Sequence, residues 1–260
     1  MEEIEIDKIY NEDCFVGMQR IPDKSIDAII CDLPYGVLNR KNKHAQWDNV
    51  IPFAPLWEQY ERIIKDNGAI VLFGQGMFTA QLMMSNPALW RYNLIWDKQR
   101  TTGFLNVKKQ PLRQTEVISV FYKKQPIYNP IMKQRGFNER NHSRGHKRGF
   151  TNRCYGSISK TPSFVSNEKY PTNLISIPKK VGVGTLHPTE KPILLLEYLI
   201  QTYTNSGGLV LDNCIGCGTT AIAAINTNRH FIGFEIDKEY FDIAEKRINN
   251  AKSKLQLELF

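Results

Sequence analysis

Residues 209–220, which read LVLDNCIGCGTT, decide the fold class of this 260-residue chain. The apolar start predicts a short buried strand at 209–211, and the run after the glycines predicts a helix over 219–226. Gly216 and Gly218 permit a tight turn and let a ligand approach the backbone closely. A buried strand that leads through a glycine turn into a helix is typical of α/β proteins.

The residues that follow extend this pattern. A strand predicted over 230–235 ends in Glu235, nineteen residues beyond Gly216, where a carboxylate can accept both hydroxyls of a ribose. The complete G-x-G-x-x-G is missing because Ala221 replaces the third glycine, and no P-loop sequence occurs. The combination predicts a nucleoside-containing cofactor. The alternative is an ordinary tight turn with no ligand.

Cys214 and Cys217 form a C-x-x-C pair inside the turn. A zinc site would need a second ligand pair at motif spacing, and a zinc deaminase would need an H-x-E motif, but the sequence has neither. We therefore interpret the two cysteines as small apolar residues of a cofactor loop and expect no metal. The five cysteines are an odd number without framework spacing, which favours a reducing cytoplasm.

Alternating strands and helices surround the glycine turn. The predicted strands are 26–31, 69–73, 93–96, 117–122, 209–211 and 230–235, and the predicted helices are 56–64, 77–84, 191–203, 219–226 and 239–251. This alternation predicts a mostly parallel sheet with helices on both faces. Aromatic residues make up 11% of the chain, which excludes a disordered or fibrous protein. We expect no membrane-spanning helix or signal peptide.

Positive charge is concentrated in one segment. The chain carries a net charge of +8, yet between Lys123 and Lys160 ten Lys/Arg residues stand against the single acid Glu139. Aromatic residues are interleaved with these charges, a pattern that favours nucleic acid over a solvated loop. We interpret residues 123–186 as a basic insert between two halves of one α/β core, 1–122 and 187–260.

Two further motifs lie beside predicted core elements. Asp32-Leu33-Pro34-Tyr35 follows the strand 26–31, at the sheet edge where α/β proteins bind ligands. A carboxylate, a carbonyl freed by the proline and an aromatic face could hold a planar ring that bears an amino group. The second motif, residues 187–192 (HPTEKP), precedes the helix 191–203; Thr189 could cap this helix, and Lys191 would suit a carboxylate. Either motif could also be an ordinary turn or helix start.

Together these motifs resemble the S-adenosylmethionine-dependent amino-methyltransferases of DNA. In that family D-P-P-Y grips the target amine, F-x-G-x-G shapes the cofactor turn, and H-P-T-Q-K-P precedes the cofactor helix. The catalytic motif precedes the cofactor motif here, as in the beta-type arrangement. The resemblance therefore implies a Rossmann-like methyltransferase fold with an inserted target-recognition region.

The resemblance also implies residue roles. Asp32, Pro34 and Tyr35 would bind the target base, which must flip out of the duplex to be reached. The implied cofactor-binding residues are Asp13, Cys14, Thr189, Lys191, Asp212, Cys214, Gly216, Gly218, Thr219, Glu235 and Ile236. The implied DNA-binding residues of the insert are Arg135, Arg140, Arg144, Lys147, Arg148 and Arg153.

The sequence departs from the family pattern at three positions. Leu33 replaces the first proline, Cys214 the phenylalanine against the cofactor, and Glu190 the glutamine. None of these changes removes a group that the chemistry needs. Cytosine enzymes of the family commonly begin the first motif with serine, so Asp32 favours adenine N6 as the methylated atom.

Three alternatives stay open from the sequence: a cytosine N4 enzyme, an RNA adenine methyltransferase and a non-catalytic nucleic-acid-binding module. The expected partner is double-stranded DNA. A second copy of the chain and a cognate restriction endonuclease are further candidate partners.

Overall fold

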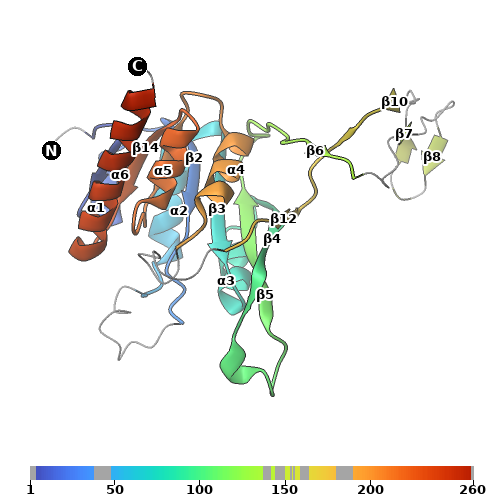
Figure 1. Ribbon diagram of the computed structural model, residues 1–260, viewed down its shortest axis with the longest axis horizontal. Coiled ribbons are helices and arrows are strands. Elements are labelled where there is room, and N and C mark those ends of the chain that lie inside the picture. The colour runs from blue at the N-terminus through green and yellow to red at the C-terminus, as the bar shows by residue number, and fades with distance from the viewer. Residues whose placement is uncertain are drawn as a thin grey trace. The chain divides into compact units, whose positions relative to one another are not determined.

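Figure 1 shows the computed structural model of the chain. The structure describes residues 4–37, 48–136, 142–143, 150–152, 154, 156–158, 164–179 and 190–258. It divides into two compact units. The core unit comprises Met1–Asn129 and Asn173–Phe260, and the insert unit comprises Pro130–Thr172.

The core unit is built on an eight-stranded sheet with the order β1-β14-β13-β2-β3-β5-β4-β12. The strands are β1 (Lys8–Tyr10), β2 (Ile26–Cys31), β3 (Ile64–Gly74), β4 (Trp90–Thr102), β5 (Arg113–Phe121), β12 (Leu174–Ser176), β13 (Leu209–Asp212) and β14 (His230–Phe234). Neighbouring strands are parallel except at the two pairings of β5, which is antiparallel to both β3 and β4. The predicted, mostly parallel sheet is thereby confirmed.

Helices cover both faces of this sheet (Figure 1). One face carries α1 (Cys14–Gln19), α2 (Phe53–Ile63) and α3 (Met77–Ser85), and the other carries α4 (Ile193–Tyr203), α5 (Thr219–Asn226) and α6 (Lys238–Glu258). Side chains of β2 alternate between the two layers, because successive residues of a strand point to opposite faces. Ala28 and Ile30 pack under α4 and α5, whereas Ile29 and Cys31 pack under α1 and α2. Both faces of the central strands are therefore buried.

The elements that differ most from the prediction lie at the β4–β5 edge. The apolar pattern predicts only residues 93–96 as a strand, but β4 is thirteen residues long, and its polar C-terminal part pairs with the start of β5 as far as Thr102 and Arg113. Cross-strand hydrogen bonds can hold this hairpin without an alternating apolar pattern. The short strand β12 adds to the same sheet. Of the segment 123–186 that the sequence predicts as an insert, residues 123–129 and 173–179 belong to the core unit.

The insert unit contains short antiparallel strand pairs. They are β6 (Lys133–Gln134) with β11 (Glu168–Lys169), β7 (His142–Ser143) with β10 (Phe164–Val165), and β8 (Phe150–Asn152) with β9 (Gly156–Ile158). Its polar, glycine-containing sequence offers no long apolar run, which accounts for strands of only two or three residues.

The start of α4 differs from the expectation. Helix α4 begins at Ile193 and its N-cap is Pro192, with no side-chain cap among the described residues. Thr189, which was expected to cap this helix, lies outside the described residues. Proline suits this boundary because it lacks the N–H that a continuing helix would need. None of the described helices has the length and apolar character needed to cross a bilayer.

Candidate active site

The candidate site is a pocket of about 650 Å³ at the carboxyl edge of the core sheet. Strand β2 leads through α2 to β3 on one side, whereas β13 leads through α5 to β14 on the other. The switch point of the sheet therefore lies between β2 and β13, which is where open α/β sheets bind ligands. Residues from the ends of both strands line the pocket, including Asp32 after β2 and Asp212 at the end of β13.

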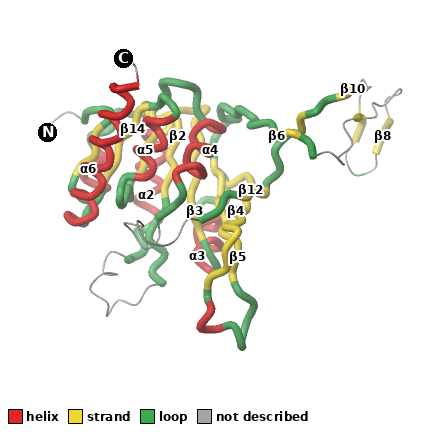
Figure 2. The backbone as a smooth tube through the Cα atoms, in the orientation of Figure 1, coloured by secondary structure: helices red, strands yellow, loops and turns green. Residues whose placement is uncertain are grey.

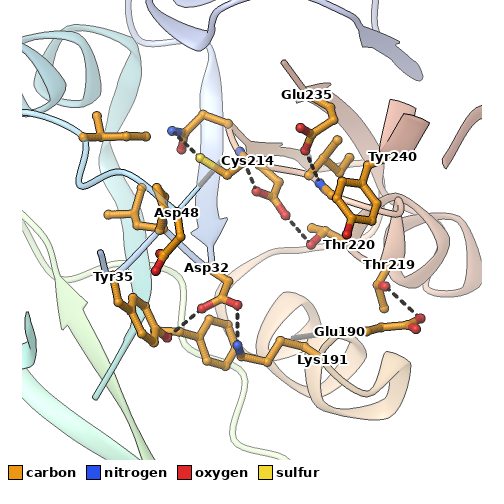
Figure 3. Close-up of a pocket in the computed structure, with 18 of the residues that line it drawn as sticks. Asp32, Tyr35, Asp48, Glu190, Lys191, Cys214, Thr219, Thr220, Glu235 and Tyr240 are labelled. Carbon is orange, nitrogen blue, oxygen red and sulfur yellow. Dashed lines mark hydrogen bonds and ion pairs between the residues drawn. The ribbon is translucent and has the colours of Figure 1, made fainter. Parts of the chain in front are cut away.

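The β2 side of the pocket holds a cluster of polar and charged groups, of which Figure 3 shows Asp32, Tyr35 and Lys191. The Tyr35 hydroxyl donates to the Asp32 carboxylate at 2.6 Å and contacts Glu116 at 3.1 Å. The Lys191 ammonium forms ion pairs with Asp32 and, at 3.1 Å, with Glu116. Lys191 also lies 4.9 Å from the centre of the Phe73 ring. One ammonium thus holds two carboxylates together at the end of β2.

Burial and pairing act in opposite directions on these groups. Burial raises the pKa of Asp32, and the Lys191 ammonium opposes that rise. Burial alone would also raise the pKa of Glu116, but Lys191 brings it below its ordinary value. Burial lowers the pKa of Lys191, and the carboxylates of Asp32 and Glu116 more than offset this effect. Lys191 therefore stays charged, and the cluster carries a net negative charge when both carboxyls are ionised.

The β13 side of the pocket holds Asp212 without a cationic partner among the described residues. One oxygen of this carboxylate accepts from the Cys214 backbone N–H at 3.1 Å, and the other accepts from the Thr220 hydroxyl at 2.5 Å. Burial raises the pKa of Asp212 to about 6 in spite of these hydrogen bonds. An ionised Asp212 would therefore be stabilised by a cationic ligand.

The glycine turn opens towards the same space. Gly216 lines the pocket at φ +55°, and a Cβ added there would meet no atom within 4 Å. Gly218 has φ +82°, and an added Cβ would lie 3.0 Å from the Cβ of Ala244 on α6. Gly216 thus leaves room for a ligand. Gly218, which is absent from the pocket lining, instead allows α5 and α6 to approach each other.

Glu235 lies directly after β14, on the wall beside the turn (Figure 3). Its two oxygens accept backbone N–H bonds from Gly216 at 2.9 Å and from Asp237 at 2.8 Å. A carboxylate has about four acceptor positions, so capacity remains for two ligand hydroxyls. Ile236 beside it is 65% exposed and lines the pocket, which offers an apolar surface to a ring.

The structure brings most of the predicted site residues together in this one pocket. Its lining includes Asp13, Cys14, Asp32, Pro34, Tyr35, Lys191, Asp212, Cys214, Gly216, Thr219, Glu235 and Ile236. Asp13 also caps α1, because its side chain accepts from the Phe15 N–H at 2.8 Å. Between described residues, no hydrogen bond ends on the Pro34 carbonyl, which agrees with a free acceptor.

The remaining predicted residues are absent from the pocket lining or lie among residues that the structure does not describe. Arg135 lies in the insert unit, where its guanidinium donates to the Ser166 carbonyl at 3.0 Å. Thr189, Arg140, Arg144, Lys147, Arg148 and Arg153 lie outside the described residues.

Sequence reasoning missed several residues of the site. Glu116 reaches the carboxyl edge because β5 runs opposite to its neighbours, which brings its first residues to that edge. Lys98 and Lys179 enter from β4 and from the segment after β12. Asp48 accepts from the Gly36 N–H at 2.8 Å near Tyr35. A charged residue at the start of an apolar strand, such as Glu116, is the signal that could have been noticed.

Comparison with known proteins gives the site its context. Residues 26–246 match the family of N6/N4 methyltransferases described as DNA methylase, and this range includes Asp32, Lys191, Asp212 and Glu235. The chain belongs to this DNA methylase family.

Named relatives agree with this assignment. The DNA methylase is 28% identical to the Type II methyltransferase M.BglII of Bacillus subtilis, over 92% of this chain and 68% of the relative. It is 26% identical to the Type II methyltransferase M1.MboII of Moraxella bovis, over 96% and 99% of the two chains. The solved M1.HpyAVI–SAM complex superposes with a TM-score of 0.63 and 26% identity, over 93% of this chain and 98% of the other. The predicted family and the Rossmann-like methyltransferase fold are both confirmed.

Proposed function

We propose that this DNA methylase transfers a methyl group from S-adenosylmethionine to the N6 amine of adenine within a specific DNA sequence. One observation carries the proposal. The Asp32–Tyr35 pair and the carboxylates of Asp212 and Glu235 line a single pocket, at the switch point of the sheet. A target amine and a cofactor bound to these residues would share one pocket, and positioning of this kind is a large source of rate enhancement.

The chemistry of the β13 side fits S-adenosylmethionine. Glu235 would hold the ribose hydroxyls, Ile236 would lie against the adenine and Asp13 would bind its edge. The space beside Gly216 would take the methionine part, whose ammonium group suits the buried Asp212. The bound cofactor supplies an electrophilic methyl group on a sulfonium. No residue of the site is therefore required to activate the methyl group.

The β2 side supplies what a weakly nucleophilic amine needs. Asp32 already accepts from Tyr35 and Lys191, but a carboxylate has further acceptor positions, and its side chain is partly exposed to the pocket. Asp32 and the Pro34 carbonyl would accept from the amine N–H groups and orient the nitrogen lone pair. Tyr35 would stack on the flipped base, which offsets part of the cost of extruding it.

Adenine is favoured over cytosine by the residue that begins this motif. A carboxylate stands at position 32, where the cytosine enzymes that the motif resembles commonly have serine. The Lys191 ammonium opposes the rise in pKa that burial imposes on this carboxyl, and the ion pair holds the carboxylate in place as an acceptor.

The test is single-molecule sequencing of genomic DNA from cells that express the chain, with Asp32→Ala as the control. We expect N6-methyladenine at one short recurring motif in the wild-type sample and none in the control. Methylated cytosine at a recurring motif, or no modification despite full expression of folded protein, would overturn the proposal.

We also propose that the basic insert recognises the DNA target through Arg135, Arg140, Arg144, Lys147, Arg148 and Arg153. Nine Lys/Arg residues against the two acids Glu139 and Glu168 within the insert unit, residues 130–172, support this assignment. Each phosphate neutralised contributes about −0.9 to the log–log salt slope of DNA affinity. Changing Arg144, Lys147 and Arg148 to Ala should flatten that slope and leave cofactor affinity unchanged.

The matched control is Lys246→Ala/Lys254→Ala, which removes two positive charges from exposed positions of α6. Its salt slope of DNA affinity should equal that of the wild type. If one of the arginines reads a guanine edge, its loss should instead relax specificity at one position by about 1–3 kcal/mol. Equal slopes and equal specificity in all three proteins would contradict a role of these residues in DNA recognition.

The proposal extends to the location and the partners of the enzyme. We place the enzyme in the cytoplasm, where double-stranded DNA is accessible. A second copy of the chain and a cognate restriction endonuclease are its candidate partners, in keeping with relatives named Type II methyltransferases.

A further inference from the structure

The tip of the β4–β5 hairpin exposes large apolar side chains. Residues 103–112 connect the two strands, and the short helix Phe104–Asn106 forms part of this turn (Figure 2). The side chain of Phe104 is 74% exposed and that of Leu105 is 84% exposed. Val107 beside them is also exposed. Adjacent large apolar side chains at a protruding tip are typical of an interaction site.

The backbone of the tip is held by local hydrogen bonds. The Gly103 carbonyl accepts from the Asn106 N–H at 3.0 Å, and the Asn106 carbonyl accepts from the Lys109 N–H at 2.8 Å. Gly103 has φ +89°, a conformation that glycine adopts without strain. The turn therefore holds its apolar side chains outward in a defined conformation.

The surroundings of the tip indicate what it contacts. Arg100, Lys108, Lys109 and Arg113 are exposed, and no acidic residue occurs between positions 98 and 115. A symmetric contact with a second copy would bring these cations against one another. The negative charges of DNA phosphates would instead complement these cations. Charge complementarity therefore favours DNA over a second chain.

The hairpin also begins at the rim of the active site. Lys98, Thr102 and Arg113 line the pocket, and Arg113 donates to Gln75 at 3.0 Å on the same rim. A base that reaches Asp32 from a duplex must pass this rim. The duplex around that base would then lie within reach of the strands that project from it.

We propose that the β4–β5 hairpin is a DNA-contacting arm, in which Phe104 and Leu105 enter the duplex beside the extruded base. Arg100, Lys108 and Lys109 contact the neighbouring phosphates. Apolar side chains inserted at a base step stabilise an unstacked duplex, and here they fill the space that the extruded base leaves. This inference rests on the proposed function, because it requires a base to leave the duplex.

The test compares the double variant Phe104→Ala/Leu105→Ala with the wild type on two duplexes that carry the motif found by sequencing. One duplex has the normal target pair, and the other has an abasic site opposite the target adenine. We expect the double variant to transfer methyl at least tenfold more slowly on the normal duplex and less than twofold more slowly on the abasic one. In the abasic duplex the target is already unpaired and needs little help to leave.

Two controls accompany this comparison. Met84→Ala removes an exposed apolar side chain from the far end of α3 and should match the wild type on both duplexes. Lys108→Ala/Lys109→Ala should reduce the log–log salt slope of DNA binding by up to about 1.8. Cofactor affinity and melting temperature should be unchanged in every variant, because the tip is exposed and lies beyond the pocket lining.

Different results would overturn the proposed arm and the proposed function. Equal defects on both duplexes, no defect on either, or conversion of a dimer to a monomer in sedimentation would overturn the arm. Absence of transfer by the wild type on both duplexes would overturn the proposed function, and the arm with it.

Discussion

The two sides of the pocket hold their carboxylates in different ways. On the β13 side, Asp212 and Glu235 accept backbone N–H and hydroxyl bonds, mostly from residues a few positions away or in the glycine turn. On the β2 side, Asp32 and Glu116 share the ammonium of Lys191, and the three residues come from distant parts of the chain. The first arrangement is local, and the second requires the complete fold.

This difference suits the two ligands. N–H groups carry only partial positive charges and do not neutralise the carboxylates that they bind. Asp212 can therefore attract the cationic cofactor, and Glu235 can accept from its hydroxyls. The full charge of Lys191 fixes the position of Asp32, so that a neutral amine meets an oriented acceptor. The comparison predicts that changes on one side of the pocket affect transfer and changes on the other affect cofactor binding.

The largest expected effect is at Asp32. Asp32→Ala should reduce methyl transfer by about 10³-fold, because the oriented acceptor for the amine is lost. Cofactor affinity by calorimetry should change less than threefold. Asp32→Asn tests the charge with little change in shape. Transfer at the wild-type rate in Asp32→Ala would exclude Asp32 from the reaction. The same rate in Asp32→Asn would show that an uncharged acceptor is sufficient.

Glu235→Ala should act on the other ligand. Hydrogen bonds between a carboxylate and ribose hydroxyls are worth about 1.5–3 kcal/mol each, so cofactor affinity should fall at least tenfold. Transfer at saturating cofactor should fall much less. The melting temperature of the cofactor-free protein controls for damage to the turn, because Glu235 also holds the Gly216 N–H. Unchanged affinity would show that the turn serves another ligand.

Asp212 predicts a pH dependence confined to the cofactor side. Its pKa of about 6 means that the carboxylate is mostly protonated at pH 5 and ionised at pH 7. A cationic ligand favours the ionised form, so affinity should rise about tenfold across this range. Calorimetry at several pH values measures it, and Asp212→Asn should remove the dependence.

The stability of the cofactor-free protein should change in the opposite direction. The pKa of Asp212 is raised in the folded state, so the unfolded chain loses this proton first as the pH increases. The contribution of Asp212 to stability is therefore lost between about pH 4 and pH 6. A wild-type affinity that did not vary from pH 5 to pH 7 would rule out Asp212 as a partner of the ligand cation.

Glu116→Gln should reduce methyl transfer least of these variants. It tests whether the ion pairs of Lys191 with Asp32 and Glu116 orient Asp32. Without the second carboxylate, Lys191 is no longer held between two partners, and Asp32 loses part of its orientation. We expect up to tenfold slower transfer, a shifted pH profile and unchanged cofactor affinity. Glu61→Gln, a surface carboxylate that pairs with Lys123, is the matched control. Equal rates and pH profiles in the two variants would mean that Glu116 has only a structural role.

The same contrast explains what could be predicted from the sequence. The strand, glycine turn, helix and acid of residues 209–235 follow one another along the chain, so local spacing is sufficient to predict that Asp212, Gly216 and Glu235 line one pocket. Glu116 is visible in the sequence only as a charged residue at the start of an apolar strand. That signal does not place it in the site, because its position depends on the reversed direction of β5. The sequence predicts that Lys191 meets a ligand carboxylate, but the structure places it between two protein carboxylates. Such long-range pairings leave no periodic signal.

Analysis of the methylated nucleosides tests the central claim most directly. Purified protein is incubated with duplex DNA that carries the identified motif and with cofactor bearing a deuterated methyl group. The DNA is then digested and its nucleosides are separated by mass. The account predicts labelled N6-methyldeoxyadenosine from the wild type and none from Asp32→Ala. Label in N4-methyldeoxycytidine, or equal labelling by the Asp32 variant, would contradict it.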